Sequence, residues 1–201
     1  MTDVKPGIQF KETMAGGFSL DADDPKQGSS LGKHNGFALA MHAQVDIDDI
    51  DKFIAQSDHP GRLSGTIDFI PMGMGMIAHS GVFNLFYPAA EPAMKLMVYE
   101  LGFQHEGEEY YLAGKKEVRD DPGFDLWSDT TTLYTQLHKG TDKSAPVVGA
   151  GILTLGVGDL LKLVSTITIV NTTSNIDKVA TISKFGSFFM GELWDSYVKY
   201  V

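Results

Sequence analysis

Cysteine is absent from this 201-residue sequence, which excludes disulfides, thiolate nucleophiles and cysteine-based zinc sites and makes a reducing compartment the default environment. Basic side chains are scarce as well, since 16 Lys and Arg stand against 26 Asp and Glu, for a formal net charge of −10. Because a negative mean field repels phosphate backbones, we expect no nucleic-acid partner.

Long apolar segments are also missing. Residues 1–10, MTDVKPGIQF, carry neither the basic region nor the apolar stretch of a secretory signal. The longest weakly polar run, 160–170, is interrupted by Lys162 and by hydroxyl residues, and it falls short of the roughly 20 residues that a helix needs to cross a bilayer. We therefore expect a cytoplasmic protein without a membrane span.

What the chain does contain is enough apolar material for one core. Hydrophobic residues make up 43% and charged residues 21% of the sequence, close to the averages of globular proteins. A chain of this length can bury a core that needs no covalent support. The composition therefore predicts a single domain over residues 1–201.

Short segments with the length and residue types of β-strands dominate the chain. Residues 7–20 and 37–45 are rich in strand-forming residues, and several of the later segments alternate between apolar and polar positions. Short connections favour antiparallel neighbours, and strands this numerous usually close into a barrel or stack as a sandwich. The later strand-length segments are 62–70, 76–87, 94–104, 109–119, 130–138 and 147–155.

Helical periodicity occurs in three places. Asp46 can cap a short helix that ends before His59, and an apolar face follows the strand at 147–155. Apolar residues spaced by three or four predict an amphipathic helix over 176–200, whereas 21–36 is predicted as a loop. We predict an α+β fold, mainly antiparallel β, with a barrel-like (lipocalin-like) sheet flanked by short helices and a C-terminal amphipathic helix.

Charged residues are densest in 115–135, KKEVRDDPGFDLWSDTTTLYT. A basic side chain there could orient an anionic group while a carboxylate acts as general base, because a charge partner and partial burial tune carboxyl pKa values. The alternative is that these charges pair with one another and fix a long connection against the barrel. The candidate catalytic residues are Lys116, Glu117, Arg119, Asp121, Asp125 and Asp129.

The same segment and the C-terminal helix predict a structural network. Glu192 on the helix is predicted to pair with Lys116 or Arg119 if the helix docks on the barrel, and Trp127 provides a large apolar anchor. The predicted network consists of Arg119, Asp120, Trp127, Glu192 and Trp194.

Methionine is concentrated in IPMGMGMI at 70–77, which places Met72, Met74 and Met76 on one side of a hairpin tip. Methionine packs adaptably, so these side chains, with Trp127 and Tyr134, are candidate contacts for an apolar ligand. Ordinary core filling is the alternative.

Metal and cofactor signals are weak throughout. The six histidines show no HxxxH or HxH spacing, and DADDPKQG at 21–28 lacks the glycine and the final glutamate of a calcium loop. The glycines at 149–158 do not follow the order of a nucleotide-binding loop. We expect neither a metal nor a cofactor.

Two runs, 115–135 with the later GAGIL and FGSFFMGELWDSY at 185–197, resemble an accessory domain found beside cholesterol-oxidase-like flavin oxidoreductases of the GMC type and beside α/β-hydrolase or lipase-like modules. FKETMAGGF, RLSGTI and GVFNLF are similar as well. The resemblance implies a helper in lipid or sterol metabolism, here standing alone. It provides no catalytic residues, because the flavin fingerprint and the hydrolase triad belong to the neighbouring modules.

The sequence leaves three functions open. The first is a non-enzymatic domain that binds a hydrophobic small molecule in its barrel or docks on a lipid-modifying enzyme. The second is an enzyme, such as an isomerase, cyclase or hydrolase, that acts on a lipid-like substrate. The third is a protein–protein interaction module, for which a homo-oligomer is one form. Ionisable groups facing a pocket would favour catalysis, and an interior filled by Leu, Phe and Met would favour a scaffold.

Overall fold

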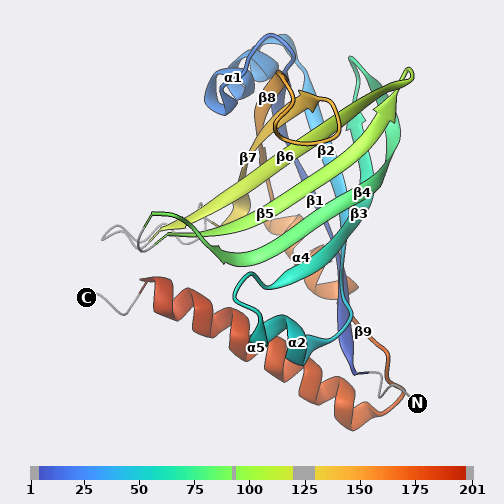
Figure 1. Cartoon of the computed structure of the whole chain (residues 1–201), viewed down its shortest axis with the longest axis vertical. Coiled ribbons are helices and arrows are strands. Elements are labelled where there is room, and N and C mark those ends of the chain that lie inside the picture. The colour runs from blue at the N-terminus through green and yellow to red at the C-terminus, as the bar shows by residue number, and fades with distance from the viewer. Residues whose placement is uncertain (1–4, 92–93, 120–129, 198–201) are drawn as a thin grey trace.

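A computed structural model describes residues 5–91, 94–119 and 130–197, and it contains a closed antiparallel barrel of eight strands with one added strand (Figure 1). This confirms the predicted α+β, mainly β, fold class. The barrel strands are β1 (Gly7–Ser19), β2 (Ala38–Ile47), β3 (Pro60–Phe69), β4 (Gly73–Pro88), β5 (Met94–His105), β6 (Glu108–Arg119), β7 (Thr132–Lys139) and β8 (Val147–Thr154). The added strand is β9 (Thr168–Val170), and the helices are α1 (Pro25–Asn35), α2 (Ile50–Ala55), α4 (Val157–Thr166) and α5 (Asn175–Tyr197).

Strand β1 closes the barrel because it is hydrogen-bonded on both sides. It pairs with β2 along ten positions, from Ile8 opposite Ile47 to Gly17 opposite Ala38. On its other side β1 pairs with β8 only near its C-terminal end, from Ala15 to Ser19, and β9 pairs with residues 7–9. The barrel wall beside the middle of β1 is therefore completed by another element.

That element is the end of α4. The Lys11 backbone amide donates to Thr166 Oγ1 at 2.8 Å, and the same hydroxyl donates to the Lys11 carbonyl at 3.1 Å. One threonine hydroxyl thus contacts both backbone groups of Lys11 on the side of β1 that neither β8 nor β9 pairs, while Lys11 faces Gln44 of β2 on the other side. Helix α4 consequently lies against β1 beside Glu12.

The barrel interior follows the two-residue period of its strands. On β2 the even and odd positions alternate between buried and partly exposed, with Leu39, Met41, Val45 and Ile47 inside. The buried side chains form one hydrophobic cluster that runs through the barrel. Burial of this continuous apolar interior is the main force that favours the folded chain.

Helix α1 covers one end of the barrel, within the segment 21–36 that was predicted as a loop. The prediction was wrong because the helix is built from small residues rather than from an apolar stripe. Asp24 accepts a hydrogen bond from the Gln27 amide, Pro25 occupies the first turn, and Gly36 ends the helix with φ of 72°. The buried Gly28 and Gly32 let the helix backbone lie directly on β8 and β1.

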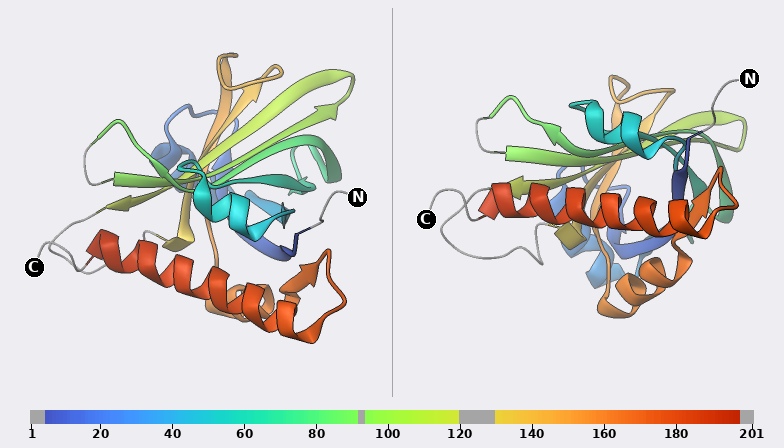
Figure 2. Two further views of the ribbon diagram at one scale, coloured as in Figure 1. Left: turned by 60° about the horizontal axis from the view of Figure 1, so that its bottom comes forward. Right: turned by 90° about the horizontal axis from the view of Figure 1, so that it is seen from below.

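Helix α5 lies across the opposite end of the barrel, between α2 and α4 (Figures 1 and 2). An aromatic cluster holds it there, since the Phe188 ring lies 5.7 Å from that of Phe53 and 6.2 Å from that of Phe86. Ion pairs at 2.6 Å join Lys184 to Asp51 on α2 and Lys95 on β5 to Glu192. The predicted amphipathic helix over 176–200 is confirmed within the described residues.

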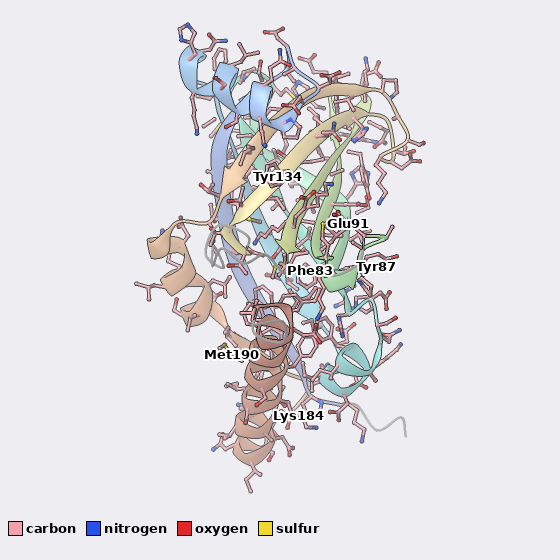
Figure 3. The ribbon with its side chains drawn as sticks, turned by 90° about the vertical axis from the view of Figure 1, so that its left-hand side faces the viewer. Phe83, Tyr87, Glu91, Tyr134, Lys184 and Met190 are labelled. Carbon is pink, nitrogen blue, oxygen red and sulfur yellow. The ribbon has the colours of Figure 1, made fainter. Side chains whose placement is uncertain are left out.

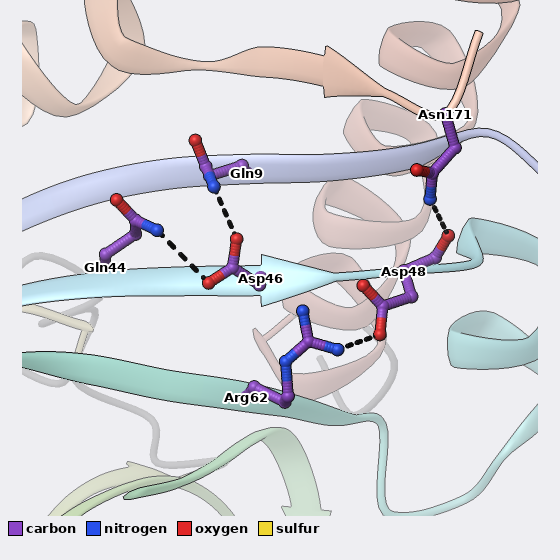
Figure 4. Close-up of polar contacts among 6 residues, drawn as sticks. All are labelled: Gln9, Gln44, Asp46, Asp48, Arg62 and Asn171. Carbon is purple, nitrogen blue, oxygen red and sulfur yellow. Dashed lines mark hydrogen bonds and ion pairs between the residues drawn. The ribbon is translucent and has the colours of Figure 1, made fainter. Parts of the chain in front are cut away.

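The turn before α5 is tied to the barrel by a set of polar contacts (Figure 4). Asn171 Nδ2 donates to the Asp48 carbonyl at 3.0 Å, and the Asp48 carboxylate pairs with Arg62 on β3. Asp46, predicted as a helix cap, instead lies within β2 and accepts from Gln9 Nε2 at 2.5 Å. Helix α2 starts later, because Asp49 caps it.

No helix in the described ranges is both long and apolar enough to cross a membrane.

Candidate ligand-binding site

A cavity of about 660 Å³ extends from the barrel interior to the gap between α4 and α5. Its volume lies within the range of small-molecule sites, roughly 300–1,000 Å³. Most of its wall is aliphatic or aromatic. The lining residues are Ile8, Phe10, Glu12, Phe83, Leu85, Met97, Tyr99, Lys116, Thr130, Thr131, Leu155, Leu163, Val164, Ile167, Ile182, Phe185, Gly186, Phe189, Met190 and Leu193.

The cavity opens to solvent on its helical side. Val164 of α4 and Ile182 and Met190 of α5 line it and are 59%, 51% and 64% exposed. Phe83 and Tyr99, which line it from the barrel strands, are 1% and 4% exposed. Figure 3 shows Met190 on α5 at the barrel end where Phe83 of β4 is found. The cavity therefore has an apolar entrance between two helices and an enclosed inner end.

Three polar side chains from different strands meet at the inner end. Glu12 of β1 and Lys116 of β6 occupy inward-facing strand positions, and Lys116 Nζ lies 3.9 Å from Glu12 Oε2. The same Nζ lies 3.5 Å from the Tyr99 hydroxyl oxygen and 4.7 Å from the centre of the Tyr99 ring. All these contacts are longer than good hydrogen bonds, so the ammonium is held by charge and by the ring face.

Glu12 is incompletely satisfied. Its Oε1 atom is buried and has no hydrogen-bond partner among the residues that the structure describes. Buried polar atoms are nearly always paired, because an unpaired one loses its hydration without compensation. An unpaired carboxylate oxygen in a residue that lines a cavity is therefore a mark of a binding site.

Burial shifts the proton affinities of the two neighbours of Glu12 in opposite directions. Desolvation lowers the pKa of Lys116 from its usual value, and the negative charge of Glu12 offsets part of this effect. Desolvation raises the pKa of Tyr99 well above 10, and Glu12 adds to that increase. At neutral pH Tyr99 is a neutral hydroxyl group, able both to donate and to accept a hydrogen bond.

The structure brings one predicted catalytic residue into the cavity, namely Lys116. Glu117 is the next residue on β6 and points to the outer face, where it pairs with Lys115 at 2.9 Å. The remaining candidates cannot be placed: the side chain of Arg119 and the whole of the three aspartates lie outside the described residues. These candidates are Arg119, Asp121, Asp125 and Asp129.

The predicted structural network is described only in part. Glu192 binds a cation on the barrel, Lys95, which the sequence did not single out. The predicted pairing of Glu192 with Arg119 involves a side chain outside the described residues. Lys116 pairs with Glu12. The other members lie outside the described residues: Asp120 and Trp127 entirely, and Arg119 and Trp194 by their side chains.

The predicted methionine site does not coincide with the cavity. Met74 is 65% exposed while Met76 is 9% exposed, so the three side chains do not share one face. Gly75 adopts φ of 66° at this hairpin tip and breaks the strand alternation on which the prediction relied. Met72 packs against the core, and Tyr134 sits between the inward-facing Leu133 and Thr135, on the outer face of β7. Among the described methionines, Met97 and Met190 line the cavity.

Sequence reasoning missed Glu12 and Tyr99. A signal was present for Glu12, since it shares its strand parity with Ile8, Phe10 and Met14, and an acidic residue at an apolar parity position marks a buried carboxylate. Tyr99 shares parity with Met97 and Leu101 in the same way. That the two residues meet Lys116 depends on barrel closure, which strand parity alone does not show.

Within the described ranges no group of three His, Asp or Glu side chains is placed to hold a metal ion. Comparisons with protein-family models, with curated proteins and with solved structures found no match, so the resemblance to accessory domains of lipid and sterol enzymes stays a prediction.

Proposed function

We propose that the protein binds a hydrophobic small molecule in the barrel, with the molecule entering between α4 and α5. The observation that carries this proposal is the cavity of about 660 Å³, walled by aliphatic and aromatic side chains and open at an apolar entrance. Transfer of an apolar ligand from water to such a wall is favourable by about 25 cal/mol per Å² of apolar surface buried. A link to lipid or sterol metabolism belongs to the same proposal, supported by the apolar wall and by the sequence resemblance.

Gly186 offers a direct test, because it lines the cavity from α5 and an added Cβ there meets nothing within 4 Å. The Cβ of a leucine at this position would meet no atom within 4 Å, the rest of the side chain would fill part of the entrance, and a helix-weakening glycine would be removed. Gly191 is the matched control: it lies on the same helix, an added Cβ also meets nothing within 4 Å, and it does not line the cavity.

The experiment is a fluorescence titration of the purified protein with the neutral apolar dye N-phenyl-1-naphthylamine. We expect saturable binding to the wild-type protein, binding at least tenfold weaker for Gly186→Leu, and wild-type binding for Gly191→Leu. Absence of saturable binding to the wild-type protein would overturn the proposal. So would equal affinities of the wild-type protein and Gly186→Leu.

A second candidate function, proton transfer to or from the bound molecule, is favoured by the polar residues at the inner end. Glu12 is a candidate base, and Lys116 and Tyr99 are candidate donors to an oxygen on the same substrate. An isomerase or cyclase would use such an arrangement. Deuterium exchange at carbon next to the carbonyl of decan-2-one separates the two functions, since a pure binding protein leaves the background rate unchanged and a proton-transfer enzyme raises it in a manner that Glu12→Gln abolishes.

A further inference from the structure

The net charge of the ionisable groups at the inner end of the cavity limits which polar head group a ligand can place there. Among the described lining residues, only Glu12, Tyr99 and Lys116 are ionisable, and they lie within one small cluster. A carboxylate and an ammonium together carry no net charge. The site has no positive excess that would attract an anion.

A ligand with an acid group would therefore bind unfavourably. Its carboxylate would place a second negative charge beside that of Glu12, whose side chain is 2% exposed, and the low local dielectric there strengthens the repulsion. The lowered pKa of Lys116 acts in the same direction, because loss of its proton leaves the site negative. An amine on the ligand would bind Glu12 but repel Lys116.

Hydrogen bonding narrows the choice further. Glu12 Oε1 requires a donor, and the Lys116 ammonium, with no protein contact shorter than 3.5 Å among the contacts described, has N–H groups to give to an acceptor. A ketone or an ether only accepts, so it would leave Glu12 Oε1 without a donor. A hydroxyl group is neutral, donates once and accepts from a cation, and so matches both requirements with one atom.

We infer that the ligand is an apolar alcohol whose hydroxyl group lies at the inner end of the cavity, donates to Glu12 and accepts from Lys116. This inference rests on the proposed binding function. It assigns an orientation in which the hydroxyl enters first and the hydrocarbon part lies against Phe10, Leu85 and Met97, with its end near α5.

The test is displacement of N-phenyl-1-naphthylamine by ten-carbon competitors that differ only in their polar group: decan-1-ol, decanoate, decan-1-amine and decan-2-one. We expect decan-1-ol to displace the dye at a concentration at least tenfold lower than any of the other three. Equal potency of the four compounds, or a preference for decanoate, would overturn the inference. The proposed function would still stand in that case, because it depends only on saturable binding of the dye. Failure of the dye itself to bind would remove both.

Replacement of Glu12 should reverse the preference, which a structural role of that residue would not do. In Glu12→Gln the ammonium of Lys116 loses its counter-charge, so a ligand carboxylate can supply it, and decanoate should displace the dye better than decan-1-ol. Glu108→Gln is the matched control. Glu108 lies on β6, eight residues before Lys116, and its side chain is 59% exposed and pairs with Lys139 at 3.6 Å. It should keep the wild-type order of potency.

The double variant Glu12→Gln with Lys116→Met guards against a folding defect in the single variant. Its site is neutral and lacks the cation, so it should bind the dye and rank decan-1-ol and decanoate within about threefold of each other. A persistent tenfold preference for decan-1-ol in this variant would show that Glu12 and Lys116 do not determine which head group binds, and the inference would be wrong.

Discussion

Lys116 Nζ lies 3.9 Å from Glu12 Oε2, inside the barrel, with only 3% and 2% of the two side chains exposed. The separation is too long for a good hydrogen bond, so the two charges have left water for a partner that compensates them incompletely. A sequence selected for stability alone would fill these positions with apolar side chains. Their presence at the end of a cavity is what directs attention to binding.

The first prediction concerns the cost of separating this pair. Glu12→Leu or Lys116→Met alone should lower the free energy of unfolding by about 3 kcal/mol, because each leaves one buried charge without its partner. The double variant should be as stable as the wild-type protein or more so, since no charge remains to be desolvated. Urea unfolding of the four proteins measures this.

Lys115→Met serves as the control for that cycle, because Lys115 is the neighbouring residue on β6 and its side chain is 54% exposed. Its loss should change the free energy of unfolding by no more than about 0.5 kcal/mol. If the double variant lost as much free energy of unfolding as the two single variants together, the interaction energy between the two side chains would be zero and the prediction would be wrong.

The strands were predictable because their alternation is a local property. The segment 109–119 matches β6, and 94–104 matches β5, since each residue's orientation in a strand follows from its parity. Helix α1 was not predictable in the same way. Its sequence has no apolar periodicity. Gly28 and Gly32 favour this helix because the backbones of β8 and β1 lie directly against them, which is a tertiary contact.

The candidate site was predictable only in part, for a similar reason. Lys116 was singled out by the density of charge around it, whereas Glu12 lies over a hundred residues earlier, where the signal is strand parity with apolar neighbours rather than a cluster of charge. The contact between them exists because β1 and β6 face each other across a closed barrel. Closure is a long-range property that no local pattern contains.

A second prediction concerns the docking of α5, which forms one wall of the cavity. Phe188→Ala removes ring contacts with Phe53, with Phe86 and with His59, whose ring lies 4.7 Å away. We expect a loss of about 2 kcal/mol, below the cost at a fully buried site because Phe188 is only partly buried. Amide hydrogen exchange in α5 should become faster while exchange in β5 and β6 changes little.

Ile176→Ala is the control for α5, since Ile176 lies on the same helix and is 82% exposed. It should leave exchange in the rest of α5 as in the wild-type protein. Uniform acceleration across barrel and helix in Phe188→Ala would contradict the view that α5 is a separately docked wall.

A third prediction concerns glycines within helices. Gly28→Ala should lower the free energy of unfolding by 2 kcal/mol or more, on the order of the cost of overpacking, because the new Cβ would lie 2.0 Å from the Ala150 carbonyl oxygen. Gly191→Ala should instead raise it by about 0.5–1 kcal/mol, since open space surrounds that position and alanine favours the helix. Thermal and urea unfolding compare the two, and an unchanged or raised stability of Gly28→Ala would refute the close packing of α1.

The last prediction is a loss of stability at alkaline pH that depends on two buried tyrosines. Burial raises the pKa of Tyr99 well above 10, and burial together with the Glu100 carboxylate, which accepts from the Tyr111 hydroxyl at 2.5 Å, raises the pKa of Tyr111. An unfolded tyrosine releases its proton near pH 10, so above that pH the folded protein binds more protons than the unfolded chain. Stability must then fall as pH rises.

Lys116 has the opposite effect below about pH 10.4, because its lowered pKa means that the unfolded chain binds the extra proton there. Measurements between about pH 11.4 and 12 isolate the tyrosines, since an ordinary lysine, with a pKa near 10.4, is then about nine-tenths neutral or more and Lys116 is neutral in both states. In this window each raised tyrosine steepens the fall by up to about 1.4 kcal/mol per pH unit. Tyr99→Phe and Tyr111→Phe should each make the slope shallower, and the double variant should combine the two effects. An unchanged slope in Tyr99→Phe would mean that its hydroxyl titrates as it does in water, which is incompatible with an enclosed inner end of the cavity.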